Sequence, residues 1–278
     1  MKFAARIRGW RKLVSSRWQR MLYGFGPDDL LAALRQVGIE VGDVVLVHSS
    51  IDRFGAFRGS ALDILATLRR AVGDSGTLLM PTIPFTGTAV DYVRSGQVFD
   101  AGRTPSRVGL LTELFRRSDG VTRSVHPTHP VAAWGALANE LLEGHVHSDT
   151  PCGPHSPYDR LVNCRGKILL LGVGVDTFTF FHAIEARLQE QMPFSPFTDE
   201  VFEVKCRTAD GREVTTRTRL FEPSVSRRRN IGKLVPELKA IGAWNEAQAG
   251  NLSVISIPAA ESVEAAQRLA ARGIYCYD

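Results

Sequence analysis

The apolar positions of this chain follow two patterns that alternate along its length. Short, mostly apolar runs of a length typical of buried strands occupy Val44–Val47, Thr77–Met80, Ile168–Leu171 and Val254–Ile257. Segments with a helical period lie around them, at residues 28–37, 61–72, 108–117, 133–143, 178–190 and 262–271. Strands alternating with amphipathic helices predict an α/β fold.

Other stretches break this alternation. Residues 84–106 and 145–157 predict long loops, and long loops in compact domains are usually functional. The segment RSVHPTHP (123–130) reads as extended, because its prolines exclude a helix interior. Residues 203–207 and 214–218 alternate around an Ala-Asp-Gly turn and predict an antiparallel hairpin. We therefore predict one α/β domain with an antiparallel insertion.

The first 21 residues differ from the rest of the chain. They hold seven basic residues and no acidic one, so residues 22–278 carry 5 − 7 = −2 of the net charge of +5. Apolar residues recur there at helical spacing, which predicts a basic amphipathic helix. Two interpretations stay open: contact with a membrane surface or partner, or packing on the chain's own body or on a second subunit of a homodimer. The apolar residues are Phe3, Ile7, Trp10, Val14, Trp18 and Met21.

The remaining composition narrows the class of protein. The body is slightly acidic, so the charge does not favour nucleic-acid binding. Four cysteines without a CxxC pair indicate reduced thiols and a cytoplasmic protein, and we expect no metal site. No apolar run approaches the ~18 residues that a membrane span needs.

One stretch, residues 166–187, combines a strand, a glycine turn and a helix. Gly172 and Gly174 follow the strand Ile168–Leu171, at a place where the backbone must turn or be closely approached. On the helix, His182 and Glu185 are three residues apart and therefore share a face. An imidazole beside a carboxylate at the end of a strand suits a general base.

Polar groups also follow the other strands. His48, Ser49 and Ser50 follow one, Thr82 follows another, and Asp176 with Thr177 follows the glycine turn. Ligands of open α/β sheets collect at the carboxyl ends of strands, so these hydroxyls and turn amides could form a phosphate-binding pocket. The alternative is that each side chain caps the helix that follows it.

The same residues resemble a known family in six ordered blocks between about Gly42 and Asn230. The blocks are GDVVLVHSSI (42–51), RGSALDIL (58–65), GTLLMPTIPF (76–85), VGLLTELFRRSDGVTRSVHPTHPVAAWG (108–135), GPHSPYDRL (153–161) and GKILLLGVGVDTFTFFHAIEA (166–186). We identify the chain as a member of the aminoglycoside 3-N-acetyltransferase family. The resemblance implies a single acyltransferase domain over residues 22–278, with a central mixed sheet flanked by helices and an antiparallel insertion.

The resemblance also implies a reaction and its residues. An acyl group passes directly from acetyl-CoA to the amine of an aminoglycoside or amino sugar, without a metal. His182 matches the family's general base, with Thr179 in the same block. The carboxylate that orients it is Glu185 or Glu222, and the family pattern favours Glu222. Coenzyme A binding maps to His48, Ser49, Ser50, Thr82, Arg107, Arg123 and His126.

Two departures from the family pattern bear on function. Pro130 stands where many members have serine, so a hydroxyl near the thioester is missing. Arg227, Arg228 and Arg229 lie where a polycationic aminoglycoside would need acids. This run fits an anionic acceptor, such as a nucleotide-linked amino sugar, or is a solvated face. The alternative is a catalytically degenerate binding protein, or a membrane-surface partner in polysaccharide assembly.

Overall fold

The computed structural model describes residues 22–278. The predicted amphipathic helix of residues 1–21 lies outside them, so its membrane or second-subunit contact stays a prediction. The strands are β1 Val44–Ser49, β2 Thr77–Pro81, β3 Phe99–Asp100, β4 Thr122–Arg123, β5 Val131–Gly135, β6 Lys167–Leu171, β7 Phe197–Arg207, β8 Glu213–Phe221, β9 Asn245–Ala249 and β10 Leu252–Pro258. The α-helices are α2 Pro27–Gln36, α3 Ala61–Val72, α4 Ala89–Arg94, α5 Leu110–Arg116, α6 Ala138–Leu142, α7 Pro157–Asn163, α8 Phe181–Leu188, α9 Pro223–Ser226, α10 Val235–Ala240 and α11 Ala259–Ala270. Short 3-10 helices are η1 Ile51–Phe54, η2 His145–His147, η3 Val175–Thr177, η4 Gln189–Gln191 and η5 Ile231–Leu234.

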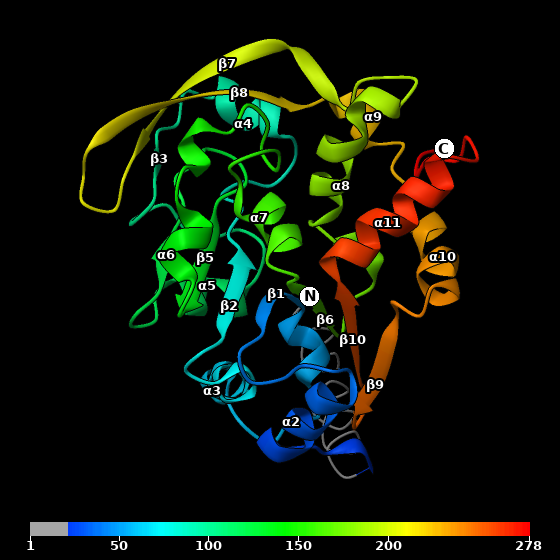
Figure 1. Cartoon of the computed structure of the whole chain (residues 1–278). Coiled ribbons are helices and arrows are strands. Elements are labelled where there is room, and N and C mark those ends of the chain that lie inside the picture. Colours follow the sequence, from blue (N-terminus) through cyan, green and yellow to red (C-terminus); the bar gives the residue numbers. More distant parts are fainter. Residues whose placement is uncertain (1–21) are drawn as a thin grey trace, which may run out of the picture.

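A mixed sheet forms the centre of the described chain, with the strand order β4-β5-β2-β1-β6-β10-β9 (Figure 1). β1 pairs in parallel with β2 and with β6, while β5 and β10 continue the sheet on either side in antiparallel pairing. The predicted central mixed sheet flanked by helices is therefore confirmed. Because the three inner strands are parallel, their carboxyl ends meet at one edge, where ligands collect in such sheets.

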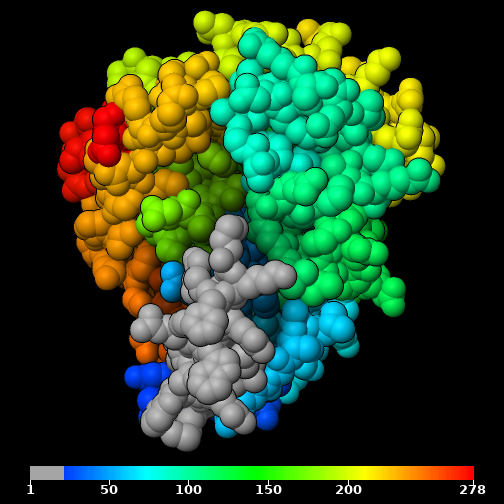
Figure 2. All heavy atoms as spheres, turned by 180° about the vertical axis from the view of Figure 1, so that it is seen from behind, coloured from blue at the N-terminus to red at the C-terminus, as the bar shows by residue number. Residues whose placement is uncertain are grey.

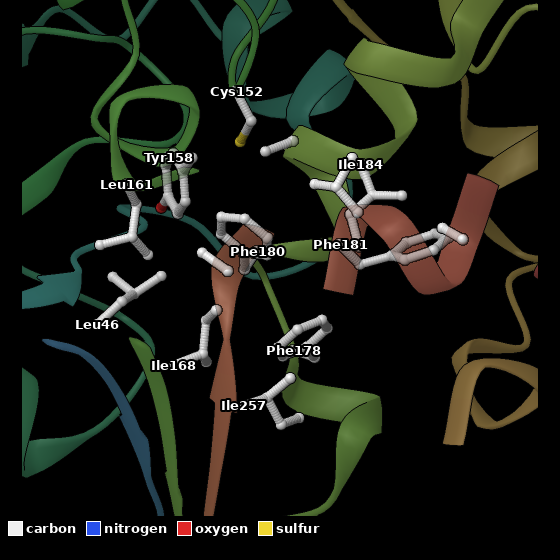
Figure 3. Packing of buried hydrophobic residues seen from close by; sticks show 14 of the residues in the cluster. Leu46, Cys152, Tyr158, Leu161, Ile168, Phe178, Phe180, Phe181, Ile184 and Ile257 are labelled. Atoms are coloured by element: carbon white, nitrogen blue, oxygen red, sulfur yellow. The ribbon is translucent and has the colours of Figure 1, made fainter. Parts of the chain in front are cut away.

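Both faces of the sheet are buried, and side chains alternate between them. On β1, Val45 and Val47 join the core that α2, α3 and α5 cover, whereas Leu46 joins the core on the other face. That second face packs against α7, α8, α10 and α11. Figure 3 shows Phe178 and Phe180 within this core. Continuous apolar runs are what a strand buried on both faces requires, which explains why these strands were readable from sequence.

A second sheet, β3-β7-β8, contains the antiparallel β7–β8 hairpin of the insertion, and the two-residue strand β3 pairs in parallel with β7. Its long β7–β8 hairpin arches over one end of the molecule and brings Phe221, the last residue of β8, towards α8 and α9 (Figure 1). The hairpin was predicted, but it starts earlier and ends later than expected. The first residue of β7, Phe197, pairs with the last residue of β8, Phe221, and a bulge in β7 lies between Phe197 and Val201.

Several elements differ from the prediction. The helix expected at 133–143 is strand β5 followed by the short helix α6, because pairing with β2 overrides the helix propensity of the alanines. The loop expected at 84–106 contains α4, whose Thr88 cap accepts a hydrogen bond from the backbone of Asp91, and strand β3. The helices α7 and α10 and strand β9 were not predicted. Within residues 22–278, no helix has the length and apolar content to cross a membrane.

Candidate active site

The centre of the site is a pair of side chains on α8. His182 Nδ1 lies 2.6 Å from Glu185 Oε2, and the two residues are separated by three positions on the helix. A carboxylate only accepts hydrogen bonds, so Nδ1 carries the proton and donates it. The other ring nitrogen, Nε2, is then left unprotonated and able to accept a proton. The pair predicted from spacing is thus a formed hydrogen bond.

Two residues far away in the sequence hold the other oxygen of Glu185. Arg229 donates from Nε to Oε1 at 2.6 Å, and the hydroxyl of Tyr277 donates to the same oxygen. Glu185 has a fully buried side chain, so these three donors replace the water it has lost. Tyr277 carries no local signal in the sequence and was not predicted, and Arg229 was predicted only as part of a charge run.

Aromatic rings fix the orientation of His182. The ring of Phe221 stacks on the imidazole with centroids 4.2 Å apart, and His129 meets it edge-on at 5.4 Å. The Arg229 guanidinium also lies over the Phe221 ring, 4.9 Å from its centroid. The end of the β7–β8 hairpin and the loop before β5 therefore hold a side chain that α8 supplies.

Burial and charge set the protonation state of the pair. Burial lowers the pKa of His182 below its ordinary value of 6.5, and the nearby Arg229 lowers it further, against the opposing effect of Glu185. Burial raises the pKa of Glu185, but hydrogen bonding and charge from His182 and Arg229 outweigh it, so its pKa lies below normal. At neutral pH the imidazole is neutral and the carboxylate ionised, which is the state that a general base requires.

His182 lines one cavity, and a second cavity shares Val108 with the first. The first, here called the His182 cavity, has a volume of about 570 Å³. The second, the His48 cavity, has a volume of about 540 Å³, and Val108 lines both. A hollow is visible between the teal and orange surfaces in Figure 2. The His182 cavity is lined by Ile83, Phe85, Gly87, Thr88, Ala89, Val108, His129, His182, Phe221, Pro223, Ser226, Arg227 and Arg229. The His48 cavity is lined by Val47, His48, Ser49, Pro81, Arg107, Val108, Gly109, Thr112, Thr177 and Thr179.

Four of the predicted ligand-binding or catalytic residues meet in the His48 cavity. They are His48, Ser49, Arg107 and Thr179, from the end of β1, the loop before α5 and the turn before α8. Burial, together with the charge of His182, lowers the pKa of His48 to about 3, so its ring is neutral. Its Nε2 is buried without a hydrogen-bond partner among the described residues. Ser50 is partly buried and does not line this cavity.

Three other predicted coenzyme A contacts are buried and already bonded within the protein. Arg123 donates to the Thr82 hydroxyl at 2.8 Å and to the carbonyl oxygens of Thr82 and Thr104, both at 2.5 Å. The Thr82 hydroxyl in turn donates to the Pro130 carbonyl. His126 is fully buried and stacks on His145 at 4.6 Å. Arg123 and Thr82 therefore use these groups within the protein, whereas His126 Nε2 has no hydrogen-bond partner among the described residues. The assignment of the three residues to coenzyme A stays a prediction.

Glu222 also occupies a different place from the one that the family pattern favours. Its carboxylate accepts hydrogen bonds from the backbone and hydroxyl of Ser224, at 3.2 and 3.0 Å, and so caps α9. In the structure Glu185, and not Glu222, contacts His182, and a catalytic role for Glu222 stays a prediction. A cap at the start of a helix is the ordinary use of a carboxylate at this position.

The fold and the site together define a class of protein: an α/β enzyme whose buried histidine–carboxylate pair faces an open cavity. The family model "aminoglycoside 3-N-acetyltransferase" matches residues 46–271. The chain therefore belongs to the aminoglycoside 3-N-acetyltransferase family, as predicted, and acetyl-CoA is the acyl donor of these acetyltransferases.

Individual relatives and structures agree with this assignment. The chain is 29% identical over 205 residues to the aminoglycoside N(3')-acetyltransferase-like protein YokD of Bacillus subtilis, covering 68% of this chain and 75% of that protein. It is 34% identical over 166 residues to aminoglycoside N(3)-acetyltransferase III of Salmonella sp, covering 55% of this chain and 58% of that protein. It is 31% identical over 224 residues to aminoglycoside N(3)-acetyltransferase VIII of Streptomyces fradiae, covering 75% and 74%.

Two solved structures share the fold over nearly the whole chain. The structure of aminoglycoside acetyltransferase AAC(3)-Xa superimposes with a TM-score of 0.77 at 29% identity, covering 90% of this chain and 93% of that one. The complex of AAC-IIIb with CoASH superimposes with a TM-score of 0.75 at 25% identity, covering 91% and 98%.

Proposed function

We propose that this protein transfers an acetyl group from acetyl-CoA to a primary amine of an aminoglycoside or amino sugar, with His182 as the general base. The observation that carries the proposal is the His182–Glu185 pair, which presents a neutral imidazole to the His182 cavity. We infer that the acyl group is acetyl from membership of the family, because the cavity walls do not by themselves distinguish acyl chains.

The chemistry follows from the arrangement of the two cavities. A sugar amine is mostly ammonium at neutral pH and must lose a proton before it attacks the thioester carbonyl. The ammonium first releases one proton to the solvent, and the neutral amine attacks the thioester carbonyl. As the new C–N bond forms, His182 takes the second proton from the nitrogen. The C–S bond then breaks, and the imidazolium returns this proton to the leaving thiolate, so that coenzyme A leaves as the thiol. Glu185 keeps His182 in the tautomer that is protonated at Nδ1, and it stabilises the imidazolium that forms when Nε2 takes up a proton.

The donor fits the His48 cavity better than the His182 cavity. Arg107 is exposed at the His48 cavity, where its guanidinium can pair with a phosphate. Ser49 and the unpartnered imidazole of His48 are the donors that we assign to the thioester oxygen, each worth about 3 kcal/mol if it acts in this way. With Val108 shared by both cavities, the thioester and the amine can meet beside His182.

The test is thiol release from acetyl-CoA by the purified protein with an amine acceptor. His182→Ala is expected to lower kcat by about 10²- to 10⁴-fold, the usual contribution of a positioned base. His147→Ala is the matched control, because His147 is exposed and lines neither cavity. Unchanged thiol release in His182→Ala would show the proposal to be wrong, and coenzyme A binding without turnover would favour a degenerate binding protein.

A cytoplasmic location is part of this proposal. All four cysteines of the chain are free thiols, which suits a reducing compartment. The homodimer and the membrane contact of residues 1–21 remain predictions from the sequence.

A further inference from the structure

The described walls of the His182 cavity carry positive charge and no acidic side chain. Arg227 and Arg229 are the charged residues among those that line it, beside the hydroxyls of Thr88 and Ser226. A site for a polycationic acceptor needs carboxylates to balance the ammonium groups, since charge complementarity determines which partners are rejected. The acceptor side of the site lacks that complement within residues 22–278.

The two arginines differ in how their charges are compensated. Arg229 is paired with the buried carboxylate of Glu185, so its charge is largely balanced within the protein. Arg227 is exposed, and its side chain forms no hydrogen bond or ion pair with any described residue. The uncompensated charge at the cavity is therefore that of Arg227.

Arg228, the next residue in the chain, shows that only some arginines of this run have a free charge at the cavity. Arg228 donates from Nε to the Asp278 carbonyl at 2.6 Å, and its guanidinium lies over the Phe194 ring. It does not line the His182 cavity. The three consecutive arginines are thus divided among three uses: Arg228 holds the end of the chain, Arg229 holds Glu185, and Arg227 alone is available to a ligand.

Arg229 also places a positive charge near the base, although Glu185 opposes its effect on His182. Arg229 lowers the pKa of both His129 and His182, after the larger effect of burial. An acceptor bearing several ammonium groups would add to this repulsion. An acceptor with a phosphate or carboxylate would pair with Arg227 through the charge-assisted hydrogen bonds that arginine forms well with these groups.

We propose that the preferred acceptor is a sugar-sized amine that carries an anionic group, with Arg227 binding the anion while His182 receives the proton of the amine. The cavity volume of about 570 Å³ lies within the range of small-molecule sites. This inference rests on the proposed acetyl transfer and names the substrate class for the same site. A phosphate and a carboxylate would both accept charge-assisted hydrogen bonds from Arg227. The acceptors in the experiment distinguish an anionic amine from a polycation.

The experiment compares three acceptors in the thiol-release assay with the full chain. Glucosamine and glucosamine 6-phosphate differ only in the anionic group, and gentamicin is the polycation. We expect kcat/KM to be about 10- to 100-fold higher for glucosamine 6-phosphate than for glucosamine, the ratio that one charged hydrogen-bonding contact provides. The preference should weaken as ionic strength rises, because Arg227 is exposed.

Arg227→Ala should remove most of this preference by raising KM for glucosamine 6-phosphate towards the KM for glucosamine. Arg228→Ala is the matched control and should keep the preference. Faster turnover of gentamicin, with a ratio that Arg227→Ala does not change, would overturn the inference and leave the proposed acetyl transfer intact. Absence of thiol release with all three acceptors would instead contradict the proposed function itself.

Discussion

Glu185 connects the residues of the site through its carboxylate. It accepts hydrogen bonds from His182, Arg229 and Tyr277, and it lies at the back of the site with no exposed side-chain surface. Loss of any donor leaves a buried charge less well solvated, which is costly in a low-dielectric environment. Arg229 has a second effect, because its positive charge disfavours protonation of the neighbouring imidazole.

We predict that Arg229→Gln moves the acid limb of the pH profile of kcat/KM to higher pH. The guanidinium lowers the pKa of His182, so its removal raises that pKa, and the less compensated Glu185 raises it further. The base then becomes protonated at a higher pH, and activity at mildly acid pH falls. Arg228→Gln removes a neighbouring arginine that does not line the His182 cavity, and it should keep the wild-type profile. A limb that stays in place or moves to lower pH would contradict this account.

At the scale of elements, the turn between β6 and α8 decides where His182 lies. Gly172 has φ of 66° and follows the end of β6. A Cβ there would lie 2.5 Å from the Cβ of Arg53 and 2.8 Å from Leu252, so the close approach that the sequence indicated is real at this position. Gly174 has an ordinary backbone conformation, and a Cβ there would meet nothing within 4 Å.

We therefore expect Gly172→Ala to lower the free energy of unfolding by about 1–3 kcal/mol, through a strained backbone and a steric clash. Displacement of the turn should also lower kcat, since α8 carries His182. Urea unfolding and thiol release measure the two effects. Gly174→Ala is the control in the same turn and should change stability by less than about 0.5 kcal/mol. Equal effects of the two substitutions would show that packing at Gly172 is not the cause.

At the scale of the whole molecule, burial of histidines couples stability to pH. His48, His126, His129, His145 and His182 all have a lowered pKa, with burial the largest cause in each case. The pKa of His48 falls to about 3 and that of His145 to about 4. The unfolded chain therefore binds more protons than the folded protein once the pH drops below about 6.5.

The expected consequence is a loss of stability between pH 7 and pH 5. Each buried neutral histidine contributes stability that is fully present above its unfolded pKa and decreases by up to about 1.4 kcal/mol per pH unit below it. The urea midpoint should fall over this range, with net proton uptake on unfolding measurable by calorimetry in buffers of different ionisation enthalpy. A midpoint that stays constant from pH 7 to pH 5 would contradict the buried neutral state.

Much of the framework was predictable because it depends on local patterns. Apolar runs indicated β1, β2, β6 and β10, since strands buried on both faces are continuous in sequence. Prediction failed where pairing overrode propensity, as for β5, and where short elements left weak signals, as for β9.

The sequence by itself determined the elements around His182 and its partner, because residues three apart on a helix share a face whatever surrounds them. Six ordered blocks determined the family. Only the tertiary structure decided that Glu185 and not Glu222 contacts His182, that Arg123 is bonded internally, and that Arg227 lines the cavity while Arg228 does not. The contacts of Arg123 with Thr82, of Arg228 with Asp278 and of Tyr277 with Glu185 join residues 41, 50 and 92 positions apart, and no local pattern encodes a contact made across the fold.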